Sequence, residues 1–227
     1  ALIDDIIPKK MAYPGSKIER PKLEHKSISI EELDIFQKMR SGAVIGTPDD
    51  KEDMLLKMMA EQLGYAEKGV IVNEKEFSDI VVNGGHTKLL RGVADSKYTE
   101  QFKYGDYFAG KGLQANGIYT AYGESMERTV NSYRGKGEGT IITMALDKDA
   151  KIIDGDKLRE LFYKENLDLL KSTEPKDIIN LKFQILQDPG RFAMLKGYDA
   201  IRLPENEYMV VLNRKALYIL DTNIGGN

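Results

Sequence analysis

Two glutamates and an arginine are the residues of this 227-residue chain whose types and positions could do chemistry. Glu205 and Glu207 are two positions apart at the start of the apolar run "YMVV". Residues two apart in an extended strand project to the same side, so their carboxylates are expected to share a face. Arg91 lies in the apolar segment "LLRGV", where a guanidinium is costly unless it is paired or opens into a cleft. Surface solvation of the glutamates and a salt bridge of the arginine are the alternatives.

The segment "NGIYTAYGES", residues 116–125, offers a binding surface and no obvious catalytic group. Gly117 permits a tight backbone turn, and Tyr119 and Tyr122 supply flat amphipathic rings. Thr120 supplies a hydroxyl where a strand is expected to run into a helix. A tyrosine-rich strand end that packs into the core is the alternative.

Composition removes several classes of site. The chain has no cysteine, which excludes thiol nucleophiles, disulfides and cysteine-based metal sites. His25 and His86 are its only histidines, so any metal would rest on carboxylates, and no metal is expected. The sequence has no P-loop, GxSxG elbow, HExxH or EF-hand pattern.

Charge and hydropathy suggest a soluble protein and do not indicate a nucleic-acid partner. The 33 basic and 36 acidic residues nearly balance, so no global field attracts a polyanion. No apolar run approaches the roughly 18 residues that a membrane span needs. A soluble protein with no membrane span is therefore expected.

The N-terminal third predicts an arm and then helices. The first 28 residues are proline-containing and aperiodic, which is typical of an extended arm or linker, with a packed arm as the alternative. Ser29 and Glu32 form a capping-box pattern before a short amphipathic helix. A second helix is expected between Thr47 as N-cap and Gly64 as stop. The expected organisation is an arm over 1–28, a helical lobe over 29–80 and a core over 81–227.

The rest of the chain predicts short strands and helices that do not alternate as repeating βαβ units. This order of elements indicates an α+β fold. Strands are expected within 69–77, 79–93, 107–123 and 139–154, and again at 199–203, 207–212 and 216–220. Helices are expected at 124–133, 156–171 and 174–187, the last capped by Ser172 or Thr173, and in a short segment closed by Gly197.

Three of these segments together resemble the ADP-ribosyltransferases. "LLRGV", "NGIYTA" and "ENEYMVVLNRKALYI" occur in the order and approximate spacing of that superfamily's three blocks. "NGIYTA" is similar to the "GIYFA" block of the poly-ADP-ribose polymerase branch, whereas Arg91 and the Glu205-x-Glu207 pair resemble the bacterial toxin branch. The toxin branch usually has Ser-Thr-Ser where this chain has Tyr119-Thr120-Ala121, so the pattern is a hybrid. The resemblance covers residues 85 to 221, and "GYDAIRLPENEYMVVLNR" is more loosely similar to transferase modules of phage head and portal proteins.

The resemblance implies an ADP-ribosyltransferase-like fold, with two packed, mainly antiparallel sheets around a cleft for NAD+. NAD+ would be the substrate, broken between nicotinamide and ribose. Glu207 would stabilise the oxocarbenium-like transition state, as carboxylates do in glycosidases. Tyr119 would stack on the cationic nicotinamide ring, and Arg91 would bind the diphosphate or brace the ribose.

The other candidates would support these groups. Glu205 would orient or deprotonate an acceptor guanidinium, and Thr120 would hydrogen-bond Glu207. Gly92 and Gly117 would give the cofactor backbone clearance, and Tyr122 would add to the NAD+ surface.

The resemblance therefore implies mono-ADP-ribosyl transfer to a protein side chain, with arginine favoured. NAD+ glycohydrolysis is one alternative. A catalytically inert phage structural or partner-binding module with the same fold is another, and the N-terminal helices could themselves dock a partner. A secreted toxin and a phage-associated protein are both compatible with the sequence, and the oligomeric state stays open.

Overall fold

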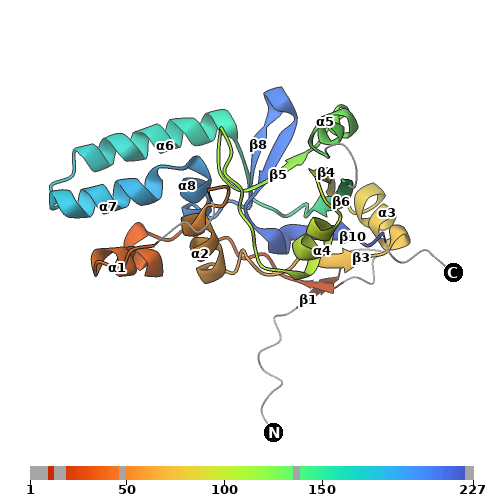
Figure 1. Cartoon of the computed structure of the whole chain (residues 1–227), viewed down its shortest axis with the longest axis horizontal. Coiled ribbons are helices and arrows are strands. Elements are labelled where there is room, and N and C mark those ends of the chain that lie inside the picture. Colours follow the sequence, from red (N-terminus) through yellow and green to blue (C-terminus); the bar gives the residue numbers. More distant parts are fainter. Residues whose placement is uncertain (1–9, 13–18, 46–49, 135–138, 223–227) are drawn as a thin grey trace, which may run out of the picture.

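The computed structural model describes residues 10–12, 19–45, 50–134 and 139–222, and the fold is α+β (Figure 1). Eight strands form one mixed sheet, and two short strands near the N-terminus, β1 (Lys10–Ala12) and β2 (Glu19–Pro21), pair separately. Across the large sheet the order is β3 (Val70–Val72), β10 (Leu217–Leu220), β6 (Thr140–Leu146), β4 (Thr87–Val93), β5 (Ile118–Ala121), β9 (Tyr208–Val211), β8 (Ala200–Leu203) and β7 (Ile152–Asp154).

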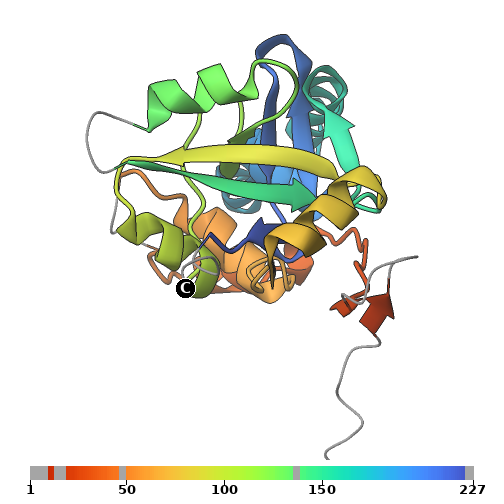
Figure 2. The same ribbon diagram turned by 90° about the vertical axis from the view of Figure 1, so that its right-hand side faces the viewer.

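The sheet has two halves joined by a narrow junction. β4 pairs with β6 along its whole length, from Thr87↔Leu146 to Val93↔Thr140, but β4 and β5 share only the pair Leu90↔Ala121. In Figure 2, β4 and β6 run across the view while the blue strands of residues 200–211 run up it. Two packed sheets were expected. Hydrogen bonds instead join the eight strands into one sheet, which changes direction between β4 and β5.

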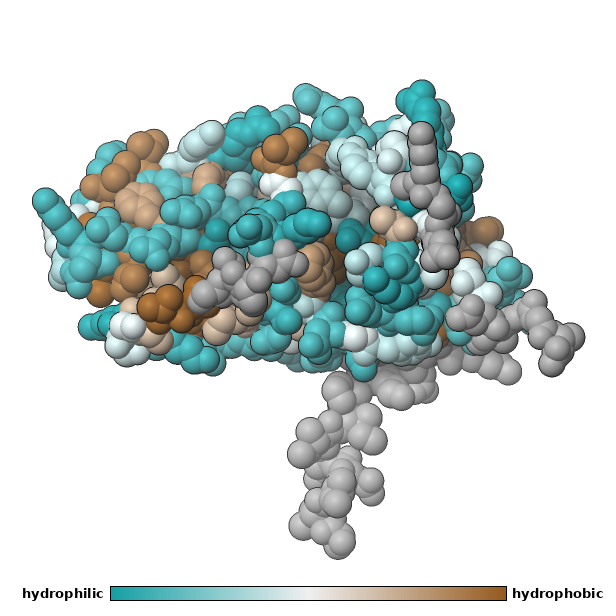
Figure 3. All heavy atoms as spheres, in the orientation of Figure 1, coloured by the Kyte–Doolittle hydropathy of each residue, from teal (hydrophilic) through white to brown (hydrophobic). Residues whose placement is uncertain are grey.

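Helices cover both sides of this sheet. The helices are α1 (Asp34–Arg40), α2 (Met54–Gln62), α3 (Glu74–Val82), α4 (Lys97–Tyr104), α5 (Met126–Tyr133), α6 (Gly155–Leu170), α7 (Lys176–Leu186) and α8 (Pro189–Leu195). Three 3-10 turns are η2 (Ile30–Glu32), η3 (Pro204–Asn206) and η4 (Arg214–Ala216). α6 and α7 form a hairpin that projects from the sheet (Figure 1), and hydrophobic residues are visible on its surface (Figure 3). Leu167 and Leu170 are exposed there.

Local patterns located most of the helices and the last strands. The predictions at 124–133, 156–171 and 174–187 are confirmed by α5, α6 and α7, and the strands at 199–203 and 216–220 by β8 and β10. Two caps differ. Thr47 lies outside the described residues, and α2 begins at Met54 after Asp53, whose carboxylate accepts from Leu56 N at 3.0 Å. Pro175, rather than Ser172 or Thr173, directly precedes α7, and no side chain caps it.

The prediction of strands through residues 74–82 is wrong, because this segment is α3. Asn73 Oδ1 accepts from Glu76 N at 2.9 Å, and Glu76 Oε2 accepts from Asn73 N at 3.0 Å. This reciprocal capping box starts a helix that the β-branched composition concealed. α4 was also missed, and the expected strand over 107–123 is reduced to Ile118–Ala121.

The N-terminal segments pack continuously with the rest of the molecule. In the arm, Leu23 is buried and His25 Nε2 lies 2.6 Å from Oδ2 of the buried Asp199. Phe36 and Leu56 belong to the same buried hydrophobic cluster as residues of β9 and β10. β3 adds a parallel strand to the edge of the sheet beside β10. The described residues therefore show no gap in core packing at the expected domain boundary, residue 81.

Candidate functional site

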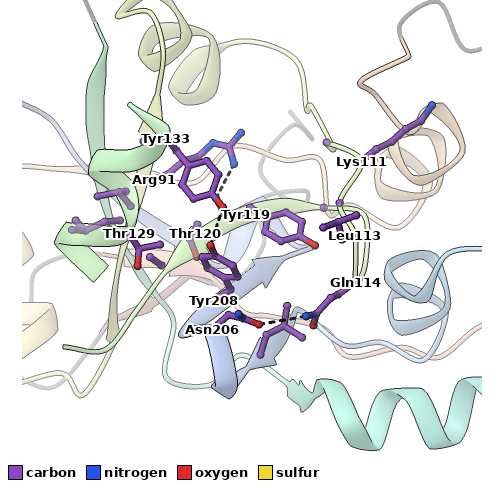
Figure 4. A pocket seen from close by; sticks show the side chains of 18 residues that line it. Arg91, Lys111, Leu113, Gln114, Tyr119, Thr120, Thr129, Tyr133, Asn206 and Tyr208 are labelled. Carbon is purple, nitrogen blue, oxygen red and sulfur yellow. Dashed lines mark hydrogen bonds between the residues drawn. The ribbon is translucent and has the colours of Figure 1, made fainter. Parts of the chain in front are cut away.

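A cavity of about 630 Å³ opens where the two halves of the sheet meet (Figure 4). Its walls come from β4, β5, α5, the end of β8, the start of β9 and the segment 110–117. Five of the predicted site residues line it: Arg91, Gly92, Gly117, Tyr119 and Thr120. Tyr122, Glu205 and Glu207 are not among its lining residues.

Arg91 supplies a positive charge that the described residues leave without an ion pair. Its Nη1 donates to the backbone oxygen of Tyr119 at 2.8 Å, which ties the guanidinium to the neighbouring strand β5. Burial lowers the pKa of Arg91 to about 10, so the group stays charged at neutral pH. Within the described part of the chain, the cavity lining contains Lys111 and no Asp or Glu. The electrostatics therefore favour an anionic ligand.

Tyr119 lies with its ring in the cavity, held at the hydroxyl. The hydroxyl donates to Ala115 O at 2.9 Å, and the ring meets that of Tyr208 edge to face, with centroids 6.1 Å apart. A Cβ atom at Gly112 would come within 2.2 Å of this ring, so only glycine lets the segment 110–117 lie against it. Burial raises the pKa of the phenol, which therefore stays neutral and can donate.

Tyr133 and Tyr208 are lining residues that the sequence reasoning missed. Their hydroxyls lie 2.9 Å apart, which bridges the end of α5 to the start of β9 (Figure 4). The pKa of Tyr208 is raised to about 12, mainly by this hydrogen bond and secondarily by burial. Tyr208 directly follows Glu207, but the partner on α5 is far away in sequence, so no local pattern marks the pair.

The two predicted glycines line the cavity and also make room for neighbouring protein elements. A Cβ at Gly92 would lie 2.5 Å from Val130 O on α5. A Cβ at Gly117, where φ is 152°, would lie 2.6 Å from Val210 Cγ1 on β9. Gly92 therefore allows α5 to approach β4, and Gly117 allows β5 to pack on β9, whereas the expected cofactor clearance stays a prediction.

The expected hydrogen bond between Thr120 and Glu207 is absent from the described residues. Thr120 is buried, and its hydroxyl donates to Met209 O at 2.8 Å across the β5–β9 pair. This contact satisfies the hydroxyl within the sheet.

The shared strand face expected for Glu205 and Glu207 is wrong, because β9 begins only at Tyr208. Glu205 lies in η3, is exposed and lines a neighbouring cavity of about 430 Å³. Glu207 has a left-handed backbone, with φ 51° and ψ 38°. Its carboxylate accepts hydrogen bonds from the hydroxyl of Ser125 and, at 2.9 Å, from Ser125 N at the start of α5. These hydrogen bonds hold the pKa of Glu207 below its usual value.

Glu207 nevertheless borders the cavity. Asn206 and Tyr208, on either side of it in sequence, both line the cavity. Ser125 directly precedes α5, and Thr129, four residues later or roughly 6 Å along the helix axis, is a lining residue. The backbone oxygen of Glu207 accepts from Tyr122 N at 2.9 Å, so Tyr122 contributes to placing Glu207 rather than to the cavity surface.

Among the residues that the structure describes, no three His, Asp or Glu side chains are grouped so as to hold a metal ion. No helix formed by those residues has the length and apolarity to cross a membrane.

The cavity thus combines a guanidinium that has no ion pair among the described residues, three tyrosine rings and an ionised carboxylate at its border. Comparison of the chain with protein-family models, with curated proteins and with solved structures gave no match, so the function must be argued from this geometry and from the sequence.

Proposed function

We propose that this protein is an NAD+-dependent mono-ADP-ribosyltransferase that modifies a protein side chain, with arginine favoured as acceptor. The observation that carries the proposal is the pairing of Arg91, which has no ion pair among the described residues, with Tyr119 in a cavity of about 630 Å³. Small-molecule pockets typically enclose roughly 300–1,000 Å³, with a few polar groups among apolar walls. NAD+ offers this site both a diphosphate and a flat cationic ring.

The positions of the three sequence blocks support the same proposal. "LLRGV", "NGIYTA" and "NEYMVV" lie on or beside β4, β5 and β9, which are consecutive neighbours in the sheet. Segments separated by many residues in the chain therefore converge on one cavity, as a common binding task requires.

The proposed roles follow from the chemistry of each group. Arg91 presents a planar fork of donors to the diphosphate, and Tyr119 presents an aromatic face to the nicotinamide cation. When the bond between nicotinamide and ribose breaks, its electron pair leaves with the neutral nicotinamide and positive charge develops on the ribose. Glu207 is an ionised carboxylate at the border of the cavity, and it stabilises that charge once it turns from Ser125 toward the cavity. The acceptor nitrogen then bonds to the ribose carbon and loses a proton.

The test is nicotinamide release from NAD+ with an arginine-rich acceptor protein. Glu207→Gln should lower the rate about a hundredfold or more, because the developing cation loses its counter-charge. Glu61→Gln is the matched control, since Glu61 is exposed on α2 and does not line the cavity. Equal turnover by Glu207→Gln and the parent protein would remove Glu207 from the mechanism, and no turnover by the parent would reject the enzymatic proposal.

NAD+ glycohydrolysis is the second candidate, and the position of Glu205 favours it. Glu205 does not share a strand face with Glu207, so the acceptor-orienting carboxylate of the transfer reaction is not in its expected place. Labelled ADP-ribose distinguishes the two reactions: label on the acceptor protein indicates transfer, and free label indicates hydrolysis.

An inert binding module is the third candidate, favoured by the engagement of Glu207 with Ser125. Calorimetric binding of NAD+ without nicotinamide release would support it.

A further inference from the structure

The wall of the cavity formed by residues 110–114 is held by a buried polar network that reaches the N-terminal helices. We infer that Asn116 and Asp53 are positioning residues for the binding site, because they fix this wall against Tyr119. The identity of the ligand rests on the proposed function, whereas the link between these residues and the wall does not.

Asn116 uses its side-chain amide and its backbone N–H to join three parts of the chain. Its Oδ1 accepts from Gly112 N at 3.0 Å, and its Nδ2 donates to Asp53 Oδ2 at 2.7 Å. Its own N–H donates to Asp188 Oδ1 at 2.8 Å. The Oδ1 contact closes the turn of residues 112–116, and the other two anchor that turn to α2 and α8.

The two carboxylates that hold Asn116 are themselves fixed as helix caps. Asp53 is buried, and its second oxygen accepts from Leu56 N in the first turn of α2. Asp188 Oδ2 accepts from Arg191 N in the first turn of α8. Arg191 Nε also lies 3.1 Å from Asp53 Oδ2, which compensates that buried charge. Carboxylates constrained in this way offer Asn116 a rigid attachment.

Backbone pairing reinforces the link. Asp53 N donates to Ala109 O at 3.0 Å, and Lys111 N donates to Lys51 O at 3.1 Å. Gly110 in turn exchanges two hydrogen bonds with Gly117, at 3.1 and 2.9 Å. Residues 51–53, 109–111 and 117 thus form a short ladder that leads from the N-terminal segment to the start of β5.

The network matters for binding because Gly112 lies directly against the ring of Tyr119. The turn of residues 112–116 also encloses the tyrosine hydroxyl, which donates to Ala115 O. Releasing Gly112 N from Asn116 frees this segment, and the cavity loses a wall that is already in its binding position. The expected consequence is weaker substrate binding with little change in the chemical step, since no reacting group is removed.

The test compares Asn116→Asp with a charge-exchanged pair. Asn116→Asp places a second carboxylate beside Asp53 and repels the turn. The double variant Asp53→Asn with Asn116→Asp restores one amide and one carboxylate. It should recover part of the contact, because Arg191 Nε then faces an amide instead of a carboxylate at residue 53. Asn83→Ala is the control, because Asn83 Nδ2 also donates to a carboxylate, that of Asp79, but from the exposed end of α3.

Two readouts separate positioning from general damage. Amide hydrogen exchange of residues 109–117 should be about tenfold faster in Asn116→Asp, with α6 and α7 unchanged and the double variant between the single variant and the parent. The KM for NAD+ should rise about tenfold, with kcat within about twofold of the parent.

Exchange and KM that match those of Asn83→Ala would overturn the inference, as would a double variant no better than the single one. Absence of NAD+ turnover in the parent protein would reject the proposed function alone, because the exchange comparison still decides whether Asn116 holds the wall.

Discussion

Arg91 lines the cavity and Glu207 borders it, and each of these opposite charges is held by a hydrogen bond to another part of the chain. The guanidinium is tied to the backbone of Tyr119 and has no carboxylate partner among the described residues. The carboxylate is tied to Ser125 at the start of α5, where the N-terminal end of a helix stabilises negative charge. Under the proposed function, the diphosphate would be the counter-ion of Arg91, whereas Glu207 would exchange Ser125 for the ribose.

Replacing Arg91 should separate stability from binding. Arg91→Met removes a partly buried cation, so we expect the free energy of unfolding to rise by roughly 1–2 kcal/mol while affinity for NAD+ is lost. Thermal unfolding with and without NAD+ measures both effects. A variant that is less stable than the parent would indicate that Arg91 serves the fold instead of a ligand.

Ser125→Ala should test whether Glu207 is restrained in the free protein. The variant loses the hydroxyl donor but keeps the donation from the backbone N of residue 125, so one hydrogen bond instead of two holds the carboxylate. Nicotinamide release should therefore be retained or increased, in contrast to Glu207→Gln. Because folding depresses the pKa of Glu207, the stabilisation from this contact is present above the unfolded value, about 4.3, and is lost as the pH falls through the folded value. The stability difference between Ser125→Ala and the parent should therefore shrink below about pH 4.3. A difference that grows in acid would contradict this assignment.

At the scale of elements, the site depends on close approach at the junction of the sheet. β4 and β5 share a single residue pair, and the space beside that pair is lined by α5, which packs on β4 through Gly92. A bulkier residue at this contact would push the helix outward and displace Thr129 and Tyr133 together.

Gly92→Ala should therefore destabilise the protein. Its Cβ would meet Val130 O at 2.5 Å, and overpacking of this kind costs roughly 1–3 kcal/mol. Gly110→Ala is a control in the same cavity, because its Cβ would make an ordinary contact of 3.6 Å with Gly117 O. Denaturant unfolding of both variants checks the contrast, which would be refuted if the two changes proved equally costly.

At the scale of the whole molecule, the N-terminal region and the sheet form one packed body. β3 covers the edge of β10, α1 and α2 share the main hydrophobic cluster, and Asp53 supports the cavity wall. If the N-terminal helices also dock a partner, they do so in addition to packing in the core and supporting the cavity wall.

A chain reduced to residues 81–227 should consequently fail to fold as a stable monomer. It would expose the edge of β10 and the part of the core that Phe36 and Leu56 cover, and large cavities and open strand edges favour aggregation. Size-exclusion chromatography measures whether the fragment is monomeric, and circular dichroism measures whether it unfolds cooperatively. A monomeric, cooperatively unfolding fragment would show that the N-terminal region is dispensable.

The sequence by itself determined the α+β class, most helices and the convergence of Arg91 and Tyr119, because capping residues, periodicity and the block resemblance are local signals. Tertiary structure alone decided the rest. Glu207 lies outside strand β9 because it ends the 3-10 turn η3. Its carboxylate binds Ser125, which is distant in sequence. Asn116 meets Asp53, and Tyr133 meets Tyr208, only after β5, α2, α5 and β9 have packed. Such contacts depend on how whole elements approach one another, and no short stretch of residues encodes that approach.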